Sequence, residues 1–150
     1  MIFEGGKGEN MLIGGIEAGG TKMICAVGDE DGKLIDRITI PTEQPETTVP
    51  EMIRYLKKWN LEALGIACFG PVDLNKDSET YGFITETPKK EWKNFPMVRT
   101  FETELGIPIG FDTDVNGAVL GEVKYGAAKG CECAIYITIG TGVGVGTGVS

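Results

Sequence analysis

The stretch LIGGIEAGGTKMICAV, residues 12–27, decides how this chain is expected to begin its fold. Two segments rich in apolar and β-branched residues, 12–16 and 22–27, flank a glycine-rich turn, which predicts two neighbouring strands. A third strand-like segment, 33–40, follows the polar, glycine-bounded turn at 28–32, whose length suits a hairpin. The sequence therefore predicts a three-stranded antiparallel meander.

The remainder of the chain alternates between segments with helical and with strand periodicity. Residues 41–48 read as a connection, and Thr48 followed by Pro50 suits a capped helix start. The apolar run at 63–69 is typical of a strand buried on both faces. Further strands are expected at 107–111, 134–139 and 143–149, and further helices at 97–105 and 115–125, the last with Gly126 as its C-cap. This order predicts an α/β fold in which helices pack on the faces of a mixed sheet led by the meander.

A weak internal repeat suggests how the domains are organised. The strand, glycine-rich turn and strand at 12–27 resemble those at 134–149, as if a second copy of one architecture had begun. We therefore expect residues 11–130 to form a first domain and residues 131–150 the first hairpin of a truncated second domain. Residues 1–10 read as a leader or a non-native extension.

The composition argues against several classes of protein. The 150 residues carry 14 basic and 22 acidic side chains, a net charge of −8, so neither nucleic acid nor a membrane is an expected partner. The sequence has no histidine, which removes Ser-His-Asp and Cys-His triads. The four cysteines lack the spacing of a zinc or redox motif, so they are expected to be structural and no metal site is predicted. Without a signal peptide or membrane span, the protein is expected to be cytoplasmic.

The first candidate site is the turn Glu17-Ala18-Gly19-Gly20-Thr21-Lys22. Its glycines let the backbone approach a ligand, and its hydroxyl and lysine can join the backbone amides in holding phosphate oxygens. It is not a Walker A loop, which needs the pattern GxxxxGK[ST] running into a helix. A plain glycine-rich hairpin turn with an exposed lysine accounts for the same residues equally well.

The second candidate site is the segment Thr138-Ile139-Gly140-Thr141-Gly142-Val143-Gly144. Its GxGxG pattern is not followed by a helix, so a dinucleotide site of the Rossmann type is not expected. Two hairpins with glycine and threonine at their turns could face each other and hold a triphosphate from both sides. The alternative is a glycine-rich strand pair packed closely against a neighbour.

The third candidate site is Phe111-Asp112-Thr113-Asp114-Val115-Asn116, which leads from an expected strand into an expected helix. Ligands bind at this end of the strands in open α/β sheets. One aspartate can serve as the helix N-cap, but a single cap does not require two aspartates and an asparagine. A carboxylate held here could accept a proton from a substrate hydroxyl, as the base does in phosphoryl transfer.

Four segments taken together, GGIEAGGTK, FGPVD, TDVN and ITIGTGVG, resemble the ROK family of sugar kinases and related repressors, and in particular its bacterial fructokinase branch. The resemblance covers residues 11–150. It implies the actin-like ATPase fold, which is ribonuclease H-like, and it implies ATP and Mg²⁺ as cofactors. It also implies a homodimer for the full-length protein and a possible structural zinc in a second domain that this sequence lacks.

The resemblance further assigns roles to individual residues. Asp114 matches the base that deprotonates the attacking sugar hydroxyl. The two phosphate-binding turns would comprise Gly19, Gly20, Thr21 and Lys22 in the first, and Gly140, Thr141 and Gly142 in the second. The sugar pocket would include Gly70, Pro71, Asp73, Thr113 and Asp114. The sequence departs from common family patterns at Thr113, where an asparagine is frequent, and at Thr87-Pro88-Lys89, where Thr-Pro-Asn is frequent.

The expected function is therefore the ATP-dependent phosphorylation of a hexose hydroxyl, with fructose converted to fructose 6-phosphate. Another hexose or an N-acylhexosamine is the nearest alternative substrate. A sugar-responsive ROK transcriptional repressor is a second alternative, although the residues ahead of Met11 offer no helix-turn-helix. The 150 residues alone are expected to fold without phosphorylating sugar efficiently.

Overall fold

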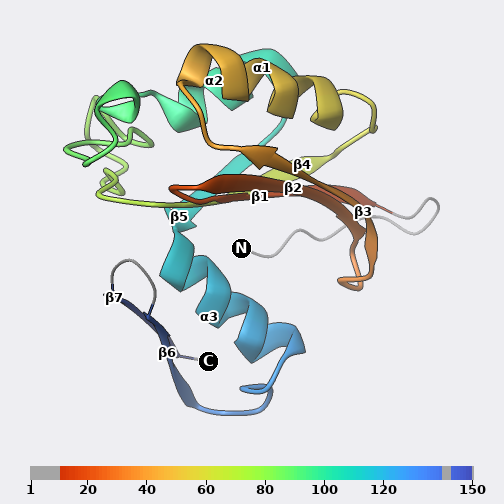
Figure 1. The fold of residues 1–150 in the computed structure, drawn as a ribbon. Helices are drawn as coiled ribbons and strands as arrows, with labels where there is room; N and C mark the ends of the chain where they lie inside the picture. Colours follow the sequence, from red (N-terminus) through yellow and green to blue (C-terminus); the bar gives the residue numbers. More distant parts are fainter. Residues whose placement is uncertain (1–10, 140–142, 150) are drawn as a thin grey trace.

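The computed structural model describes residues 11–139 and 143–149, and its main element is a five-stranded sheet of order β3-β2-β1-β4-β5 (Figure 1). The strands are β1 (Leu12–Ala18), β2 (Lys22–Asp29), β3 (Leu34–Pro41), β4 (Ala63–Cys68) and β5 (Ile109–Thr113). β1, β2 and β3 pair antiparallel, whereas β4 pairs parallel with β1 on one side and with β5 on the other. The expected mixed sheet led by a meander is confirmed.

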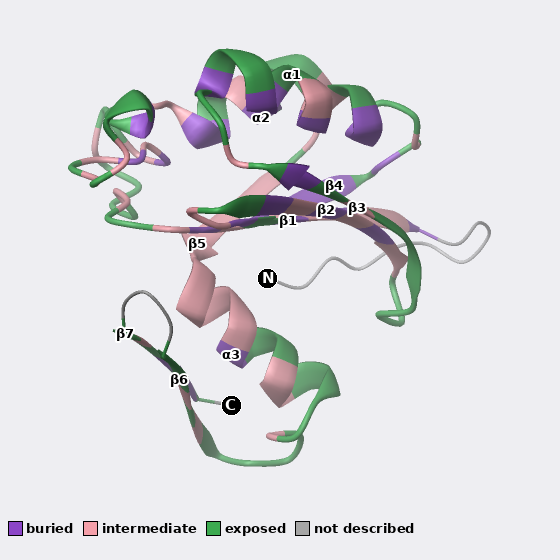
Figure 2. Ribbon diagram, viewed as in Figure 1, coloured by how far each residue is buried: buried purple, intermediate pink, exposed green. Residues whose placement is uncertain are grey.

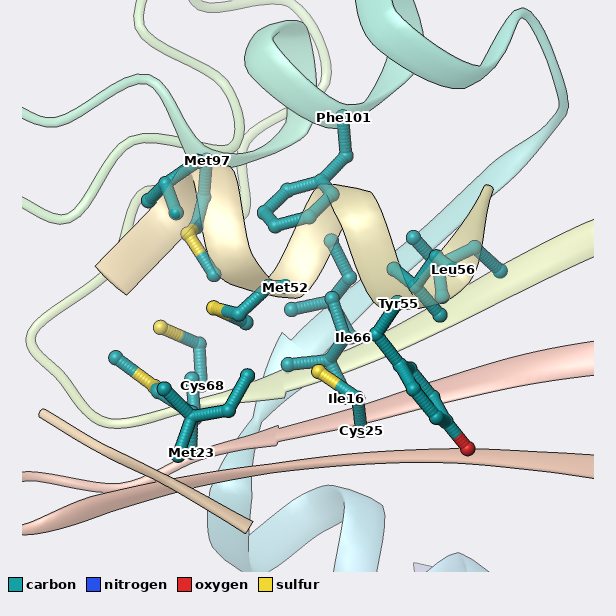
Figure 3. Packing of buried hydrophobic residues seen from close by; sticks show 14 of the residues in the cluster. Ile16, Met23, Cys25, Met52, Tyr55, Leu56, Ile66, Cys68, Met97 and Phe101 are labelled. Atoms are coloured by element: carbon teal, nitrogen blue, oxygen red, sulfur yellow. The ribbon is translucent and has the colours of Figure 1, made fainter. Parts of the chain in front are cut away.

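Helices α1 (Pro45–Leu56) and α2 (Met97–Leu105) cover one face of this sheet, and the hydrophobic core lies beneath them (Figure 2). Alternate residues of β1 and β2 point to this face, because side chains along a strand alternate with a period of two. Figure 3 shows Ile16 and Met23 from these strands close to Met52 of α1, with Met97 and Phe101 of α2 packed above.

The first helix begins at Pro45, so the expectation of a start near Pro50 was wrong. Pro45 occupies the start of the helix, where its fixed φ is favourable, and the segment read as a connection is already helical at that point. The Thr48 hydroxyl does not cap a helix: it donates to the Pro41 carbonyl at 3.2 Å and accepts from the Glu43 amide at 2.9 Å. Pro50 lies inside the helix and leaves the carbonyl four residues earlier without its helical partner.

The bounds of β5 and the way in which α3 is terminated also differ from the sequence expectation. β5 starts at Ile109 because Pro108 has no amide to donate to the neighbouring strand, although the Pro108 carbonyl accepts from the Leu64 amide at 3.0 Å. Helix α3 (Asp114–Tyr125) ends at Gly126 as expected, but Gly126 has φ −110° and is not in the left-handed conformation. A side chain closes this end instead, since the Glu122 carboxylate accepts from the Ala127 amide at 2.8 Å.

The second sheet is a separate antiparallel pair, β6 (Cys133–Ile139) and β7 (Val143–Val149), and it packs against α3 on the far side from the main sheet (Figure 1). Gly146 and Gly148 of β7 are buried against this helix. A Cβ added at Gly146 would lie 2.5 Å from the Val115 carbonyl oxygen. These glycines therefore permit close packing of β7 on the first turns of α3.

The four cysteines fall into two pairs. Cys25 and Cys68 are fully buried in the core, and burial raises the pKa of each thiol to about 12. The negative charges of Glu51 near Cys25 and Asp114 near Cys68 are the smaller causes of these raised pKa values. Cys131 and Cys133 are exposed. The buried pair has the structural role that the sequence predicted, since a protonated thiol packs as a small apolar group.

Candidate functional site

Three of the predicted site segments meet at one edge of the main sheet because their strands end in register. Ala18 of β1 pairs with Cys68 of β4, and Cys68 pairs with Thr113 of β5. The three strands are parallel, so the chain leaves them at the same edge, where ligands bind in open α/β sheets. The turn after β1, the loop that begins at Phe69 and the start of α3 at Asp114 are therefore neighbours.

The turn between β1 and β2 is closed by its own backbone and by Thr42. The Gly19 amide donates to the Lys22 carbonyl at 3.0 Å, and the Thr42 hydroxyl donates to the Gly19 carbonyl at 2.8 Å. A Cβ added at Gly19 would lie 2.7 Å from the Lys22 carbonyl oxygen. At Gly20 it would come within 4 Å only of the Lys89 Cε among the described residues, at 3.5 Å. Gly19 is thus required by the turn itself, whereas Gly20 leaves an open approach to the backbone.

Asp114 is the first residue of α3, and its carboxylate is not the helix cap. Thr113 takes that role, since its hydroxyl accepts from the Asn116 amide at 3.2 Å. Asp114 Oδ1 accepts only from the Val115 amide that follows it, at 3.0 Å, within the described residues. The side chain is half-buried. The competing interpretation of Asp114 as an N-cap is therefore wrong, and its carboxylate has capacity for another partner.

The Asp112 side chain, at the end of β5, is hydrogen-bonded to the start of α3. Its Oδ1 accepts from the Asn116 Nδ2 at 2.8 Å and from the Thr113 amide at 2.7 Å. These bonds hold the end of β5 and the first turn of α3 in one arrangement. The two aspartates of the motif thus differ: Asp112 orders the local backbone, and Asp114 is the better placed of the two to act on a ligand.

The loop after β4 contains Gly70, Pro71 and Asp73, which the family resemblance assigns to the sugar pocket. Asp73 accepts from the Thr80 hydroxyl at 2.7 Å and from the Asn75 amide at 2.9 Å. Hydrogen bonds from Ser78, Thr80 and the Asn75 backbone, in that order, hold the pKa of Asp73 below its usual value. Asp73 therefore shapes the loop that follows it, and its contact with a sugar stays a prediction.

A cleft of about 800 Å³ lies on the face of the sheet opposite α1 and α2. Its floor is made of small residues, among them Gly15, Gly65 and Ala67, and Gly117 of α3 approaches so closely that a Cβ there would lie 2.5 Å from the Ala67 Cβ. The predicted phosphate turn and Asp114 do not line this cleft. Glu17 and Asp112, which belong to two of the predicted site segments, do line it, so the cleft extends to the sheet edge at which those segments meet.

Part of the predicted site falls outside the described residues. Gly140, Thr141 and Gly142, the predicted second phosphate turn, belong to this part, as do residues 1–10. In the parts that the structure describes, no three His, Cys, Asp or Glu side chains gather into a group that could hold a metal ion. No helix of that same portion is long and apolar enough to span a membrane.

The motifs gave no role to Thr42 or Trp92 and included Lys89 only as a departure from a family pattern, although Thr42 and Lys89 lie beside the glycine turn and Trp92 anchors the loop that carries Lys89. The Thr42 hydroxyl binds the Gly19 carbonyl of the turn, and Lys89 lies against Gly20. Trp92 is 1% exposed and donates from Nε1 to the Glu43 carbonyl at 2.8 Å. Only Trp92 carries a local signal, since a tryptophan in a loop with three prolines indicates an anchored loop. The other two contacts join residues far apart in the chain.

The ROK family model matches residues 13–149, and the chain belongs to the ROK family. Its curated relatives include proteins whose names contain fructokinase. One from Bacillus subtilis is 55% identical over 131 residues, which cover 87% of this chain and 44% of the relative. The fructokinase of Pediococcus pentosaceus is 46% identical over 132 residues, which cover 88% of this chain and 46% of the relative. Matching glucokinases of Streptomyces coelicolor and Halalkalibacterium halodurans are 33% and 29% identical.

Solved structures agree with this family and with the expected actin-like ATPase fold. The ROK hexokinase of Thermus thermophilus superposes with a TM-score of 0.78 at 29% identity, over 93% of this chain and 47% of that one. The chain therefore spans about half the length of the relatives it matches.

Proposed function

We propose that the protein containing this chain is an ATP-dependent hexose kinase that converts fructose to fructose 6-phosphate. The observation that carries the proposal is the register of β1, β4 and β5, which brings an open glycine turn and the Asp114 carboxylate to one sheet edge. Fructose is favoured over glucose because the fructokinase relatives are more similar to this chain than the matching glucokinases. Other hexoses, N-acylhexosamines and a repressor role are the alternatives.

In this proposal the two parts of the edge have different tasks. The backbone amides at Gly20 and Thr21 and the Lys22 ammonium hold the ATP phosphates, since Thr21 and Lys22 are exposed beside the turn. Asp114 accepts the proton of the sugar hydroxyl as that oxygen bonds to the γ-phosphorus and the bond to ADP breaks. Positioning and charge stabilisation then supply most of the rate enhancement.

Magnesium fits the residues at this edge. Mg²⁺ prefers oxygen ligands and is usually held by one or two carboxylates together with substrate phosphates and water. The edge offers the Thr21 hydroxyl and the Asp114 carboxylate, and the described residues hold no cluster of acidic side chains that would make an all-protein site. When bound, the ion would neutralise charge on the phosphates. The structural zinc and the homodimer, as well as the second phosphate turn and a domain boundary near residue 130, stay proposals for the full-length protein.

The test is an assay of the full-length protein with ATP, Mg²⁺ and a panel of fructose, glucose, mannose and N-acetylmannosamine, with ADP formation as the readout. We expect the highest kcat/KM for fructose. A higher kcat/KM for another sugar would identify that sugar as the substrate. Sugar binding without ADP formation would favour the repressor. The 150-residue chain assayed beside it is expected to form no ADP above background.

Gly20 provides a test of the phosphate turn that the fold should tolerate. Among the described residues, a methyl group at Gly20 meets only the flexible end of Lys89, at an ordinary distance of 3.5 Å, so Gly20→Ala should leave the melting temperature nearly unchanged. The methyl group would still block a phosphate from the backbone, and we expect an ATP analogue to bind at least about tenfold more weakly. Calorimetric titration with a non-hydrolysable analogue measures this loss.

Gly121→Ala is the matched control for Gly20→Ala. Gly121 lies in α3 with open space around it, and alanine favours helices over glycine by about 1 kcal/mol. We expect unchanged affinity for the analogue and equal or higher stability. Equal affinity in Gly20→Ala and the control would mean that the turn is only structural.

A further inference from the structure

Lys89 lies against the glycine turn although it is distant from it in sequence. Its Cε is 3.5 Å from the position that a Cβ on Gly20 would take. The side chain is half-buried, and the residue stands immediately before the short helix η1 (Lys90–Trp92). The long aliphatic part of Lys89 therefore runs beside the one part of the turn where the backbone is open.

The loop that carries Lys89 is fixed to the segment that also fixes the turn. Trp92 is buried and donates from Nε1 to the Glu43 carbonyl at 2.8 Å. The adjacent residue, Thr42, donates from its hydroxyl to the Gly19 carbonyl at 2.8 Å and from its amide to the Thr21 carbonyl at 2.9 Å. Because neighbouring residues hold both parts, the position of Lys89 relative to the turn is set by the fold.

Trp92 also links this loop to the strand that lies between the turn and Asp114. Its ring contacts the ring of Phe69 edge to face, with the centroids 6.0 Å apart. Phe69 follows β4, which lies between β1 and β5 in the sheet. Trp92 thus fixes the loop to the residue that follows β4, the strand between β1 and β5.

Lys89 forms no ion pair with a carboxylate of the described residues. The ion pairs among the described residues are Lys57 with Glu104 and Lys93 with Glu86. Glu43 and Glu91 line the same hollow of about 430 Å³ as Lys89, but neither forms an ion pair with it in the described part of the chain. A half-buried lysine side chain beside open backbone amides is suited to bind an anion, and lysine binds phosphate as a point charge.

We propose that Lys89 is a second cation of the phosphate site and that its ammonium group binds the γ-phosphate of ATP. This inference rests on the proposed kinase function. If Asp114 accepts the proton of the attacking hydroxyl, the γ-phosphate must lie between the glycine turn and Asp114, and Lys89 lies beside that turn at Gly20. There the ammonium group counters the charge on the phosphoryl oxygens during transfer.

The experiment compares Lys89→Met with wild type in the full-length protein, by calorimetric titration with ADP and with a non-hydrolysable ATP analogue. Methionine keeps the aliphatic contact with Gly20 and removes the charge. We expect the analogue to bind at least about tenfold more weakly and ADP to bind within about twofold of wild type. Lys89→Arg should restore part of the affinity for the analogue. In steady state, kcat/KM for ATP should fall while KM for the sugar stays unchanged.

Lys90→Met is the control, because Lys90 is the next residue and is exposed. We expect it to match wild type in all of these measurements. Equal weakening of ADP and the analogue by Lys89→Met, or a rise in the KM of the sugar alone, would overturn the assignment to the γ-phosphate. Wild-type protein that binds nucleotide but forms no ADP with any hexose would instead reject the kinase function, and the two titrations would still report on Lys89.

Discussion

Asp114→Asn in the full-length protein is expected to lower kcat by a factor of about 10²–10⁴, the usual contribution of general-base catalysis. Asparagine has nearly the same size but cannot accept the proton of the sugar hydroxyl. The fold should tolerate the change, because Thr113 caps α3 and the amide oxygen of asparagine can still accept from the Val115 amide. Steady-state kinetics at saturating ATP and sugar measure the loss, and titration with an ATP analogue should show nearly unchanged affinity.

The matched variant for Asp114→Asn is Asp112→Asn, two residues earlier in the same motif. Asp112 accepts from the Asn116 Nδ2 and the Thr113 amide, and asparagine keeps an acceptor for both. We expect a small loss of stability and a kcat within about tenfold of wild type, since Asp112 is not the proton acceptor. A normal kcat for Asp114→Asn would reject Asp114 as the general base. A larger loss of kcat in Asp112→Asn would assign that role to Asp112.

Trp92→Ala is expected to lower the free energy of unfolding by about 3–5 kcal/mol, as is usual for truncation of a large buried aromatic side chain. The Trp92 ring is 1% exposed and packs edge to face on Phe69 and Phe95, at centroid distances of 6.0 and 5.2 Å. Its loss removes these contacts together with the hydrogen bond to the Glu43 carbonyl. Urea unfolding followed by circular dichroism measures the change without relying on tryptophan fluorescence.

Trp92→Phe separates the packing from the hydrogen bond at this position. Phenylalanine keeps most of the ring contacts and loses the Nε1 donor, so we expect a loss of about 1–2 kcal/mol. A Trp92→Ala protein within about 1 kcal/mol of wild type would mean that the loop contributes little to the fold. That outcome would also remove the argument that Lys89 is held in place by this anchor.

The elements that the sequence predicted well are those whose local pattern is unambiguous. β2 and α2 were found nearly at their observed bounds, because alternation or helical spacing is uninterrupted and Gly106 ends α2 with φ 64°. α1 was misplaced because two prolines, Pro45 and Pro50, both suit a first helical turn, and local sequence does not decide between them. The contacts of Thr48 with the preceding segment, which the sequence does not show, rule out Thr48 as the helix cap.

The candidate site was predictable as a set of residues but not as an arrangement. The motifs singled out Gly20 and Asp114, yet nothing local indicates that Ala18, Cys68 and Thr113 stand side by side across three strands. The same limit applies to Lys89, since its contact with Gly20 depends on how two distant loops fold onto one edge. Register and long-range loop packing come from the whole core, and single-sequence patterns do not contain them.

The two buried thiols allow opening of the hydrophobic core to be measured by cysteine labelling. The thiolate is the reactive form of cysteine, and with pKa values raised to about 12 and no exposed surface, Cys25 and Cys68 cannot react at neutral pH while the core is closed. Cys131 and Cys133 are exposed, so a thiol reagent can reach them without any opening of the core. Labelling of Cys25 and Cys68 therefore measures opening of the core that buries them. Cys68 is the last residue of β4, so its labelling rate measures opening of the core next to the sheet edge that carries the candidate site.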